Sequence, residues 1–357
     1  MMENKNKISI DKLSNFCTKA MLKAGMYQND AEITAKVLVT TDTWGTFTHG
    51  TKQLRKLLKN FRDGRMNPKA IPELIKEGVG WALYDGHRAM PMVSSVMAME
   101  TAISKAKETG IAYSVVKNSG HYGAAGYYAN MAAEKDMFGI SITNVDPCMM
   151  VPGSKEAILG TNPIAYAAPA GEEKPVLLDI ATSIVAASKI FKARDLSQSI
   201  PNNWLIDKNG IPTTDPTGYP AVGAIMPMAG HKGYGIALMI EILTGILSGG
   251  AFAKDVPCWV LESSEPVNQS HTFIVIDINP IMPIKTFKQR MDNLINMIKT
   301  SAKADGTDRI FLPGEMECEH REKVLADNAL TLPDDVLMSL NGLANDYDLD
   351  IDSFYLE

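Results

Sequence analysis

The chain has 357 residues, of which 45% are hydrophobic and 21% are charged, and its formal net charge is −6 at pH 7. This acidic balance argues against a surface that binds nucleic acid or an anionic membrane. The four cysteines are scattered without a CxxC pair, which predicts neither a zinc knuckle nor a disulfide framework, and no apolar run approaches the ~20 residues of a membrane-spanning helix. We therefore expect a soluble protein of the cytoplasm.

Residues 1–75 are predicted to form an N-terminal helical unit. Apolar residues recur at helical spacing over residues 11–24 and again from residue 30 onward. A third helix, over residues 51–64, places its leucines and Phe61 on one face and several lysines on the other. The unusual loop that precedes this helix contains His49.

Residues 76–300 are predicted to form a mixed α/β (α+β) core that binds a cofactor and a substrate. The expected strands are residues 81–86, 112–117, 138–144, 164–168, 176–183 and 272–277, and the expected helices are residues 92–108, 127–135, 291–303 and a long apolar helix after Gly230. The alternation is irregular and residues 207–210 carry a hairpin signal, which favours a mixed sheet over a purely parallel one. No G-x-G-x-x-G follows the first strand, which argues against the usual Rossmann dinucleotide fold.

Residues 301–357 are predicted to form a C-terminal segment that packs back on the N-terminal unit. Most of this segment is charged and helical in pattern. We expect one short strand over residues 310–312 that ends in a tight turn at residues 313–315.

Three of the six histidines, His49, His121 and His231, are each bracketed by glycine. No histidine pair has the i, i+4 spacing of a helical zinc site, so we expect no metal. An imidazole can act as an acid or a base near neutral pH if a carboxylate or carbonyl orients its other nitrogen. Asp146 and Asp179, each at the end of a predicted strand, are candidates for that role. Capping of a turn or helix is the alternative for both.

Two glycine-rich segments open predicted helices. Residues 119–126 join a strand to a helix whose first amide groups can bind an anion, and a turn in which His121 only caps the helix is the alternative. Residues 230–235 place Lys232 at the start of the long apolar helix, where it can hold a phosphate or carboxylate. A solvated lysine is the alternative, which the helix dipole disfavours. Glu241, on the apolar face of that helix, is interpreted as a buried structural carboxylate.

Several short motifs together resemble the malate/L-lactate dehydrogenase family that is distinct from the Rossmann-fold enzymes of the same names. That family includes sulfolactate, ureidoglycolate and diketogulonate oxidoreductases. The matching segments are residues 48–50, 119–123, 159–165, 179–183, 213–216, 230–235 and 313–315. Each segment alone is a weak signal, but all of them in the same order, over nearly the whole chain, make a specific one.

The resemblance implies NAD(P)-dependent interconversion of a 2-oxo acid and a 2-hydroxy acid. The sequence does not settle NAD against NADP, and we slightly favour NAD. It also implies a homodimer whose active site is shared between subunits, and hydride transfer from the cofactor with a proton from a histidine. By position, the implied catalytic residues are His49, His121 and Asp146, the cofactor-binding residues are Gly123, Asn144, Thr161, Asp179, Ile180, Ala181, His231, Lys232, Gly314 and Glu315, and the substrate-binding residues are Thr48 and Gln53.

One departure from the family pattern concerns the substrate. Relatives that act on simple 2-oxo acids are expected to carry an arginine where this chain has Gln53 and a tyrosine where it has Leu57. Arginine makes a bidentate charged contact with a carboxylate and glutamine does not, a difference of ~1–3 kcal/mol. Two alternatives therefore stay open: a cyclic imino-acid reductase, and a dinucleotide-binding protein without dehydrogenase activity.

Overall fold

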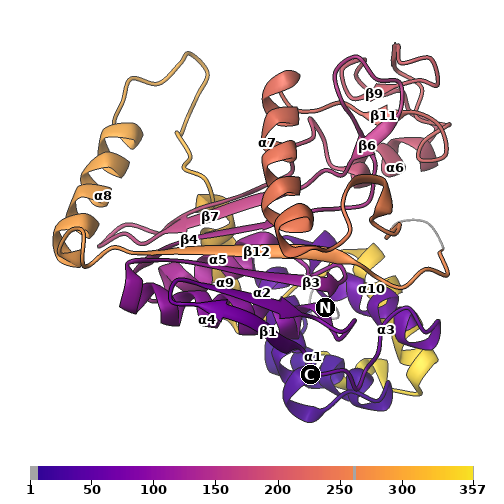
Figure 1. Cartoon of the computed structure of the whole chain (residues 1–357), viewed down its shortest axis with the longest axis horizontal. Coiled ribbons are helices and arrows are strands. Elements are labelled where there is room, and N and C mark those ends of the chain that lie inside the picture. Colours follow the sequence, from indigo (N-terminus) through magenta and orange to yellow (C-terminus); the bar gives the residue numbers. More distant parts are fainter. Residues whose placement is uncertain (1–6, 260–262, 357) are drawn as a thin grey trace, which may run out of the picture.

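The structure is a computed structural model that describes residues 7–259 and 263–356. A seven-stranded sheet with the strand order β1-β2-β3-β12-β4-β7-β8 runs through its centre (Figure 1). Among the described strands of this sheet, β2 and β3 pair in parallel and all other neighbours pair antiparallel, so the predicted mixed sheet is confirmed. The strands are β1 (Glu73–Gly78), β2 (Trp81–Asp85), β3 (Ile111–Ser119), β4 (Met137–Thr143), β7 (Ile164–Ala168), β8 (Val176–Ile180) and β12 (Gln269–Asp277).

Helices lie on both faces of this sheet (Figure 1). On one face, α4 (Pro91–Thr109) packs on β3 and β12, and α5 (Ala125–Ala133) packs on β4 and β7. The α5 helix comes so close that a β-carbon added at Gly139 would lie 2.5 Å from the carbonyl oxygen of Ala129. On the other face, α7 (His231–Glu241) continues into a π-helical turn, η3 (Ile242–Ile246), which contacts β12 and β3.

A second, smaller sheet has the strand order β10-β9-β11-β5-β6 and lies beside α6 (Ala187–Asp195). The hairpin predicted at residues 207–210 joins β9 to β10, because Asp207 Oδ1 accepts hydrogen bonds from the amides of Asn209 (2.8 Å) and Ile211 (2.9 Å). The strands of this sheet are β5 (Met149–Met150), β6 (Ala157–Leu159), β9 (Leu205–Ile206), β10 (Pro212–Thr213) and β11 (Ala224–Ile225).

The N-terminal and C-terminal helices pack against each other, and the two ends of the described chain lie in the same region (Figure 1). The Phe16 and Phe354 rings meet edge to face with centroids 5.0 Å apart, and Ser339 Oγ donates to the Lys52 carbonyl at 2.8 Å. The division of the chain at residues 75 and 300 stays a prediction. Besides the helices described above, the structure has α1 (Ile10–Lys23), α2 (Gln28–Thr43), η1 (Phe47–His49), η2 (Thr51–Gln53), α3 (Leu54–Arg62), η4 (Ala253–Asp255), α8 (Ile284–Lys299), α9 (Glu315–Asp327), α10 (Asp334–Tyr347) and η5 (Ile351–Phe354).

Two sequence predictions differ from the structure. Residues 310–312 do not form a strand: the Pro313 carbonyl accepts one hydrogen bond from the Leu177 amide (3.1 Å), and Pro313 has no N–H with which to continue a ladder. The helix predicted over residues 291–303 begins earlier, after Pro283, and ends at Lys299. Proline at the start of a helix removes an amide that has no helical partner, which explains the earlier start.

Candidate active site

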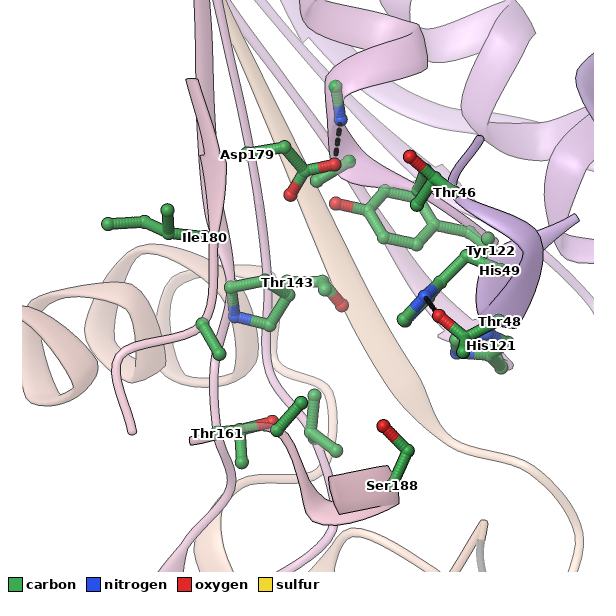
Figure 2. A pocket seen from close by; sticks show the side chains of 18 of the residues that line it. Thr46, Thr48, His49, His121, Tyr122, Thr143, Thr161, Asp179, Ile180 and Ser188 are labelled. Atoms are coloured by element: carbon green, nitrogen blue, oxygen red, sulfur yellow. Dashed lines mark hydrogen bonds between the residues drawn. The ribbon is translucent and has the colours of Figure 1, made fainter. Parts of the chain in front are cut away.

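A cavity of about 730 Å³ lies where the His49 loop, the end of β3 and the ends of β4, β7 and β8 meet (Figure 2). The volume is in the range of ~300–1,000 Å³ that is typical of small-molecule and cofactor sites. Much of its wall is apolar, and this part includes Leu177, Leu178, Ile180, Ala181, Ala187 and Phe191.

His49 reaches the cavity from η1, one of two short turns between α2 and α3. Its Nδ1 lies 2.9 Å from Thr48 Oγ1, a contact that orients the ring (Figure 2). Burial lowers the pKa of His49 below its ordinary value. The ring is therefore neutral at pH 7 and able to accept a proton.

His121 enters from the loop between β3 and α5, and its ring centroid lies 5.5 Å from that of His49. Trp259 stacks on the His121 ring at 4.8 Å. Burial is the main cause that lowers the pKa of His121 well below its ordinary value, and repulsion from Lys56 and from the protonated forms of His49 and His271 adds to it. Its Nε2 is buried and has no hydrogen-bond partner among the described residues. The two predicted histidines thus come together at one cavity, from segments that are distant in the sequence.

His271 also lines the cavity, although its sequence context carried no signal. It is fully buried on β12, with Nδ1 2.7 Å from Thr143 Oγ1 and Nε2 3.0 Å from Ser119 Oγ. Its ring stacks on Tyr122 with centroids 4.2 Å apart, and burial lowers its pKa to about 3. His271 is a neutral, hydrogen-bonded ring that supports the wall.

The two aspartates proposed to orient a histidine line the cavity but have other contacts. Asp179 Oδ2 accepts a hydrogen bond of 2.7 Å from the Gly126 amide, so a carboxylate of this chain occupies the start of α5 (Figure 2). The amides at the start of α5 were expected to be unpaired, and this contact corrects that expectation for the amide of Gly126. Burial raises the pKa of Asp179 to about 6. Asp146 is 3% exposed, burial raises its pKa, and its Oδ1 has no hydrogen-bond partner within the described chain.

The residues assigned to the cofactor fall into two groups. Six of them line the cavity: Gly123, Thr161, Asp179, Ile180, Ala181 and Gly314. The other four do not belong to its lining: Asn144, His231, Lys232 and Glu315. Lys232, at the start of α7, was expected to hold the cofactor beside the two histidines. In the described part of the chain, it does not line the cavity that contains them.

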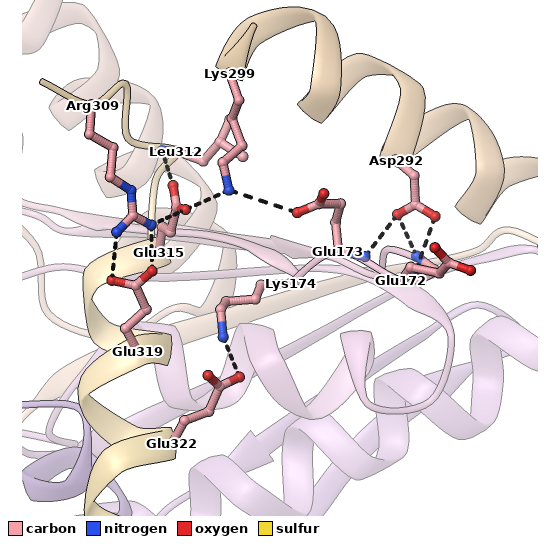
Figure 3. Close-up of polar contacts among 11 residues, drawn as sticks. Glu172, Glu173, Lys174, Asp292, Lys299, Arg309, Leu312, Glu315, Glu319 and Glu322 are labelled. Carbon is pink, nitrogen blue, oxygen red and sulfur yellow. Dashed lines mark hydrogen bonds and ion pairs between the residues drawn. The ribbon is translucent and has the colours of Figure 1, made fainter.

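Each of these four residues has a different setting. His231 and Lys232 are exposed at the start of α7. Asn144 is buried, and its Nδ2 donates to the Ala251 carbonyl (2.9 Å) and to Glu241 (3.3 Å). Glu315 is 3% exposed and pairs with Arg309 and, at 2.7 Å, with Lys299 (Figure 3). Asn144 and Glu315 thus serve the fold by their contacts.

Both residues assigned to the substrate, Thr48 and Gln53, line the cavity. The Gln53 side-chain amide donates to the Thr48 carbonyl and so closes the turn that carries His49. Besides His271, sequence reasoning missed Lys56, Trp259 and Glu317, which also line the cavity. Lys56 follows Gln53 by one turn of α3, and this helical spacing is the one signal that could have found it.

The two unpartnered atoms, His121 Nε2 and Asp146 Oδ1, provide a test of whether a ligand fits. Buried polar atoms in proteins are nearly always hydrogen-bonded. A ligand with a polar group beside a flat apolar body would satisfy these atoms and cover the wall around Ile180 and Ala181. A nicotinamide ring with a small 2-oxo or 2-hydroxy acid has that character, so the residues present fit this pair of ligands.

Comparison with known proteins agrees with the site. Residues 8–341 match the family model described as malate/L-lactate dehydrogenase. The chain is 41% identical to the malate dehydrogenase of Pyrococcus horikoshii (88% of each chain covered) and 36% identical to the L-sulfolactate dehydrogenase of Methanocaldococcus jannaschii (99% and 98%). The structure of malate dehydrogenase from Entamoeba histolytica superposes with a TM-score of 0.90 at 29% identity, covering 97% and 99%. The chain therefore belongs to the malate/L-lactate dehydrogenase family of oxidoreductases.

Proposed function

We propose that this cavity catalyses hydride transfer between NAD(P)H and a 2-oxo acid, and the reverse oxidation of a 2-hydroxy acid. The observation that carries the proposal is the meeting of the His49 and His121 rings, 5.5 Å apart, at an apolar-walled cavity. The segments around Gly123, Thr161, residues 179–181 and Gly314 would hold the cofactor. When bound, the nicotinamide ring supplies the hydride.

His121 is the proposed proton donor. Its buried Nε2 lacks a protein partner and borders the cavity, which suits a group that transfers a proton to a ligand atom. Burial disfavours the imidazolium form, so His121 is mostly neutral at pH 7. The fraction that is protonated gives up its proton readily to a developing alkoxide, and the neutral ring accepts the proton in the reverse oxidation. His49, oriented by Thr48, would hydrogen-bond the substrate oxygen from the other side or share this role.

Substitution of each histidine tests the proposal. His121→Asn should lower kcat by ~10²–10⁴ with little change in cofactor affinity, and His49→Asn should do the same if it shares the proton. His87→Asn is the control, because His87 is exposed and pairs with Glu73 at 3.0 Å, away from the cavity. Wild-type turnover in both active-site variants would overturn the assignment.

A substrate panel separates the proposed activity from its alternatives. NADH and NADPH oxidation would be followed with pyruvate, oxaloacetate, bulky and sulfonated 2-oxo acids, and cyclic 2-imino acids. Reduction of 2-oxo acids supports the dehydrogenase. Reduction of imines alone would indicate an imino-acid reductase, and cofactor binding without any reduction would indicate a binding protein.

NAD rather than NADP is the proposed cofactor. Asp179 and Glu317 both line the cavity, and the charge of Glu317 contributes to the raised pKa of Asp179. Two carboxylates close enough to interact would repel the additional phosphate of NADP. Glu317→Gln should raise kcat/KM with NADPH relative to NADH by ~10-fold. Glu322→Gln is the control: Glu322 lies on α9 like Glu317, but it pairs with Lys174, and its substitution should leave the ratio unchanged.

A homodimer is the proposed assembly, with the active site completed by the second subunit. The face of α7 and η3 exposes large apolar side chains, including Ile242 (50%), Ile246 (49%) and Leu247 (59%). An apolar patch of this kind is typical of a protein interface. Ile246→Glu with Leu247→Glu should shift the protein to monomer in sedimentation and lower kcat, whereas Val79→Glu should not. A wild-type monomer would contradict the assembly.

The cytoplasm is the proposed location. None of the four cysteines, all of which lie in the described part of the chain, forms a disulfide, which suits a reducing compartment. Among residues 7–259 and 263–356, no helix combines the length and the apolar character needed to cross a membrane.

A further inference from the structure

An acid substrate needs a positive charge in the cavity, and few of the lining side chains carry one. The two imidazoles are neutral at pH 7 because their pKa values are lowered. Among the described residues that line the cavity, the cationic side chains are Lys52 and Lys56. Lys52 pairs with Asp335 at 2.6 Å, on the side of α10. Gln53 is neutral, and its amide already donates to the Thr48 carbonyl.

Lys56 is placed beside the proposed proton donor. It is half-buried on α3, and its Nζ lies 4.7 Å from the centroid of the Trp259 ring. The same ring stacks on His121 at 4.8 Å, so Trp259 links the ammonium group to the catalytic imidazole. The charge of Lys56 also acts on His121 and on Asp146, which places it within electrostatic reach of both.

We propose that the Lys56 ammonium binds the carboxylate of the substrate and so selects 2-oxo acids over neutral carbonyl compounds. This inference rests on the proposed function. An ammonium group is a compact point charge that does not require the planar, bidentate geometry that a guanidinium imposes. The site should therefore accept 2-oxo acids of varied shape, whose carboxylate lies toward α3 and whose carbonyl oxygen lies toward His121.

A purely structural role is the competing explanation. The cation–π contact with Trp259 could serve only to hold the loop that carries this ring. The two roles differ in one measurable way. A carboxylate anchor affects the acid but not its neutral ester, whereas a loop support affects both substrates equally.

The test compares a 2-oxo acid with its methyl ester in the full-length protein with NADH. Lys56→Met keeps the aliphatic stem and should lower kcat/KM for pyruvate by about 10- to 100-fold, while the value for methyl pyruvate changes by less than about 3-fold. Lys56→Arg should keep most of the preference for the acid. Lys59→Met removes a neighbouring charge on the exposed side of α3, where Lys59 pairs with Asp63, and is the matched control.

A binding measurement keeps the test independent of turnover. Oxamate, a monoanionic analogue of pyruvate, should bind the protein–NADH complex with a Kd raised at least about 10-fold in Lys56→Met and unchanged in Lys59→Met. Lys56→Gln replaces Lys56→Met if the latter fails to fold. Equal losses for acid and ester, or unchanged oxamate binding, would overturn the role of Lys56 while leaving the dehydrogenase intact. A wild-type protein that reduces no 2-oxo acid would instead overturn the proposed function, and the inference with it.

Discussion

The carboxylate of Asp42 lies directly behind Gly50, so that a β-carbon added at Gly50 would lie 1.9 Å from Asp42 Oδ1. Asp42 is fully buried, and its Oδ2 accepts hydrogen bonds from the Thr51 amide (3.1 Å) and from Thr51 Oγ1 (2.6 Å). The short turns η1 and η2, between which Gly50 lies, are thus held from behind by one side chain of α2. The position of His49 depends on this contact.

Gly50→Ala should displace the turn that carries His49. The added methyl group has no space, because neither the helix that holds Asp42 nor its hydrogen bonds to Thr51 can yield easily, and overpacking of this kind costs about 1–3 kcal/mol. We expect a lower midpoint in urea unfolding and a lower kcat. Gly235→Ala is the control, since a β-carbon there meets no atom within 4 Å. Equal midpoints for the two variants would contradict the prediction.

Asp42→Asn should change how stability depends on pH. Burial raises the pKa of Asp42 to about 7, against an unfolded value near 3.8. The native state therefore binds the proton more tightly, and this carboxyl makes the free energy of unfolding fall as pH rises from about 4 to about 7. Histidines with lowered pKa values, such as His271, act in the opposite direction, so the measurement is the difference between wild type and variant across that range.

In that difference, the variant should gain stability relative to wild type as the pH rises. Urea unfolding at pH values from 4 to 8 gives the free energies of both proteins. A constant difference over the range would show that Asp42 does not titrate with a raised pKa.

Trp259→Ala should alter the protonation of His121. The indole stacks on this ring at 4.8 Å and excludes water from it. Without the indole, the pKa of His121 should rise toward its ordinary value, because burial is the main cause of its depression. For reduction of a 2-oxo acid, in which His121 must be protonated, the alkaline limb of the pH profile of kcat/KM should then move to higher pH, and Trp259→Phe should keep it closer to wild type. Superimposable profiles for wild type and Trp259→Ala would exclude this role.

Glu241→Leu should destabilise the fold strongly. Glu241 is 3% exposed and accepts hydrogen bonds from Asn162 Nδ2 (2.7 Å), Asn144 Nδ2 (3.3 Å) and the Ala253 amide (2.6 Å). Its removal leaves the Ala253 amide without its acceptor and takes one of two hydrogen bonds from each asparagine amide, which still donates to the Ala251 or Ala237 carbonyl. A buried donor that loses its acceptor costs about 1–3 kcal/mol. Urea unfolding measures the loss.

Glu156→Gln is the matched control for Glu241→Leu. Glu156 pairs with Lys254 at 2.6 Å, but both side chains are more than half exposed, so the loss should be far smaller than for Glu241→Leu. If the two substitutions cost the same, the buried hydrogen bonds of Glu241 add nothing to stability.

The sequence by itself was sufficient for the mixed sheet and for most of its strands and helices, because hydrophobic period and turn residues act locally. It also singled out His49 and His121 by the glycines around them, and both rings line the cavity; their catalytic role stays a prediction. The interpretation of Glu241 as a buried structural carboxylate is confirmed, because its place on an apolar helix face is itself a local pattern.

Only the tertiary structure decided which residues share the cavity. Lys56 and Trp259 meet across segments that nothing in the local pattern connects, and Asp179 occupies the start of α5 through a contact between distant parts of the chain. His231, bracketed by glycine like the other two, lies exposed and away from the cavity. The spacing of residue types along a segment predicts whether that segment forms a helix, a strand or a turn. Which of its side chains reach the cavity depends on how distant segments pack against one another.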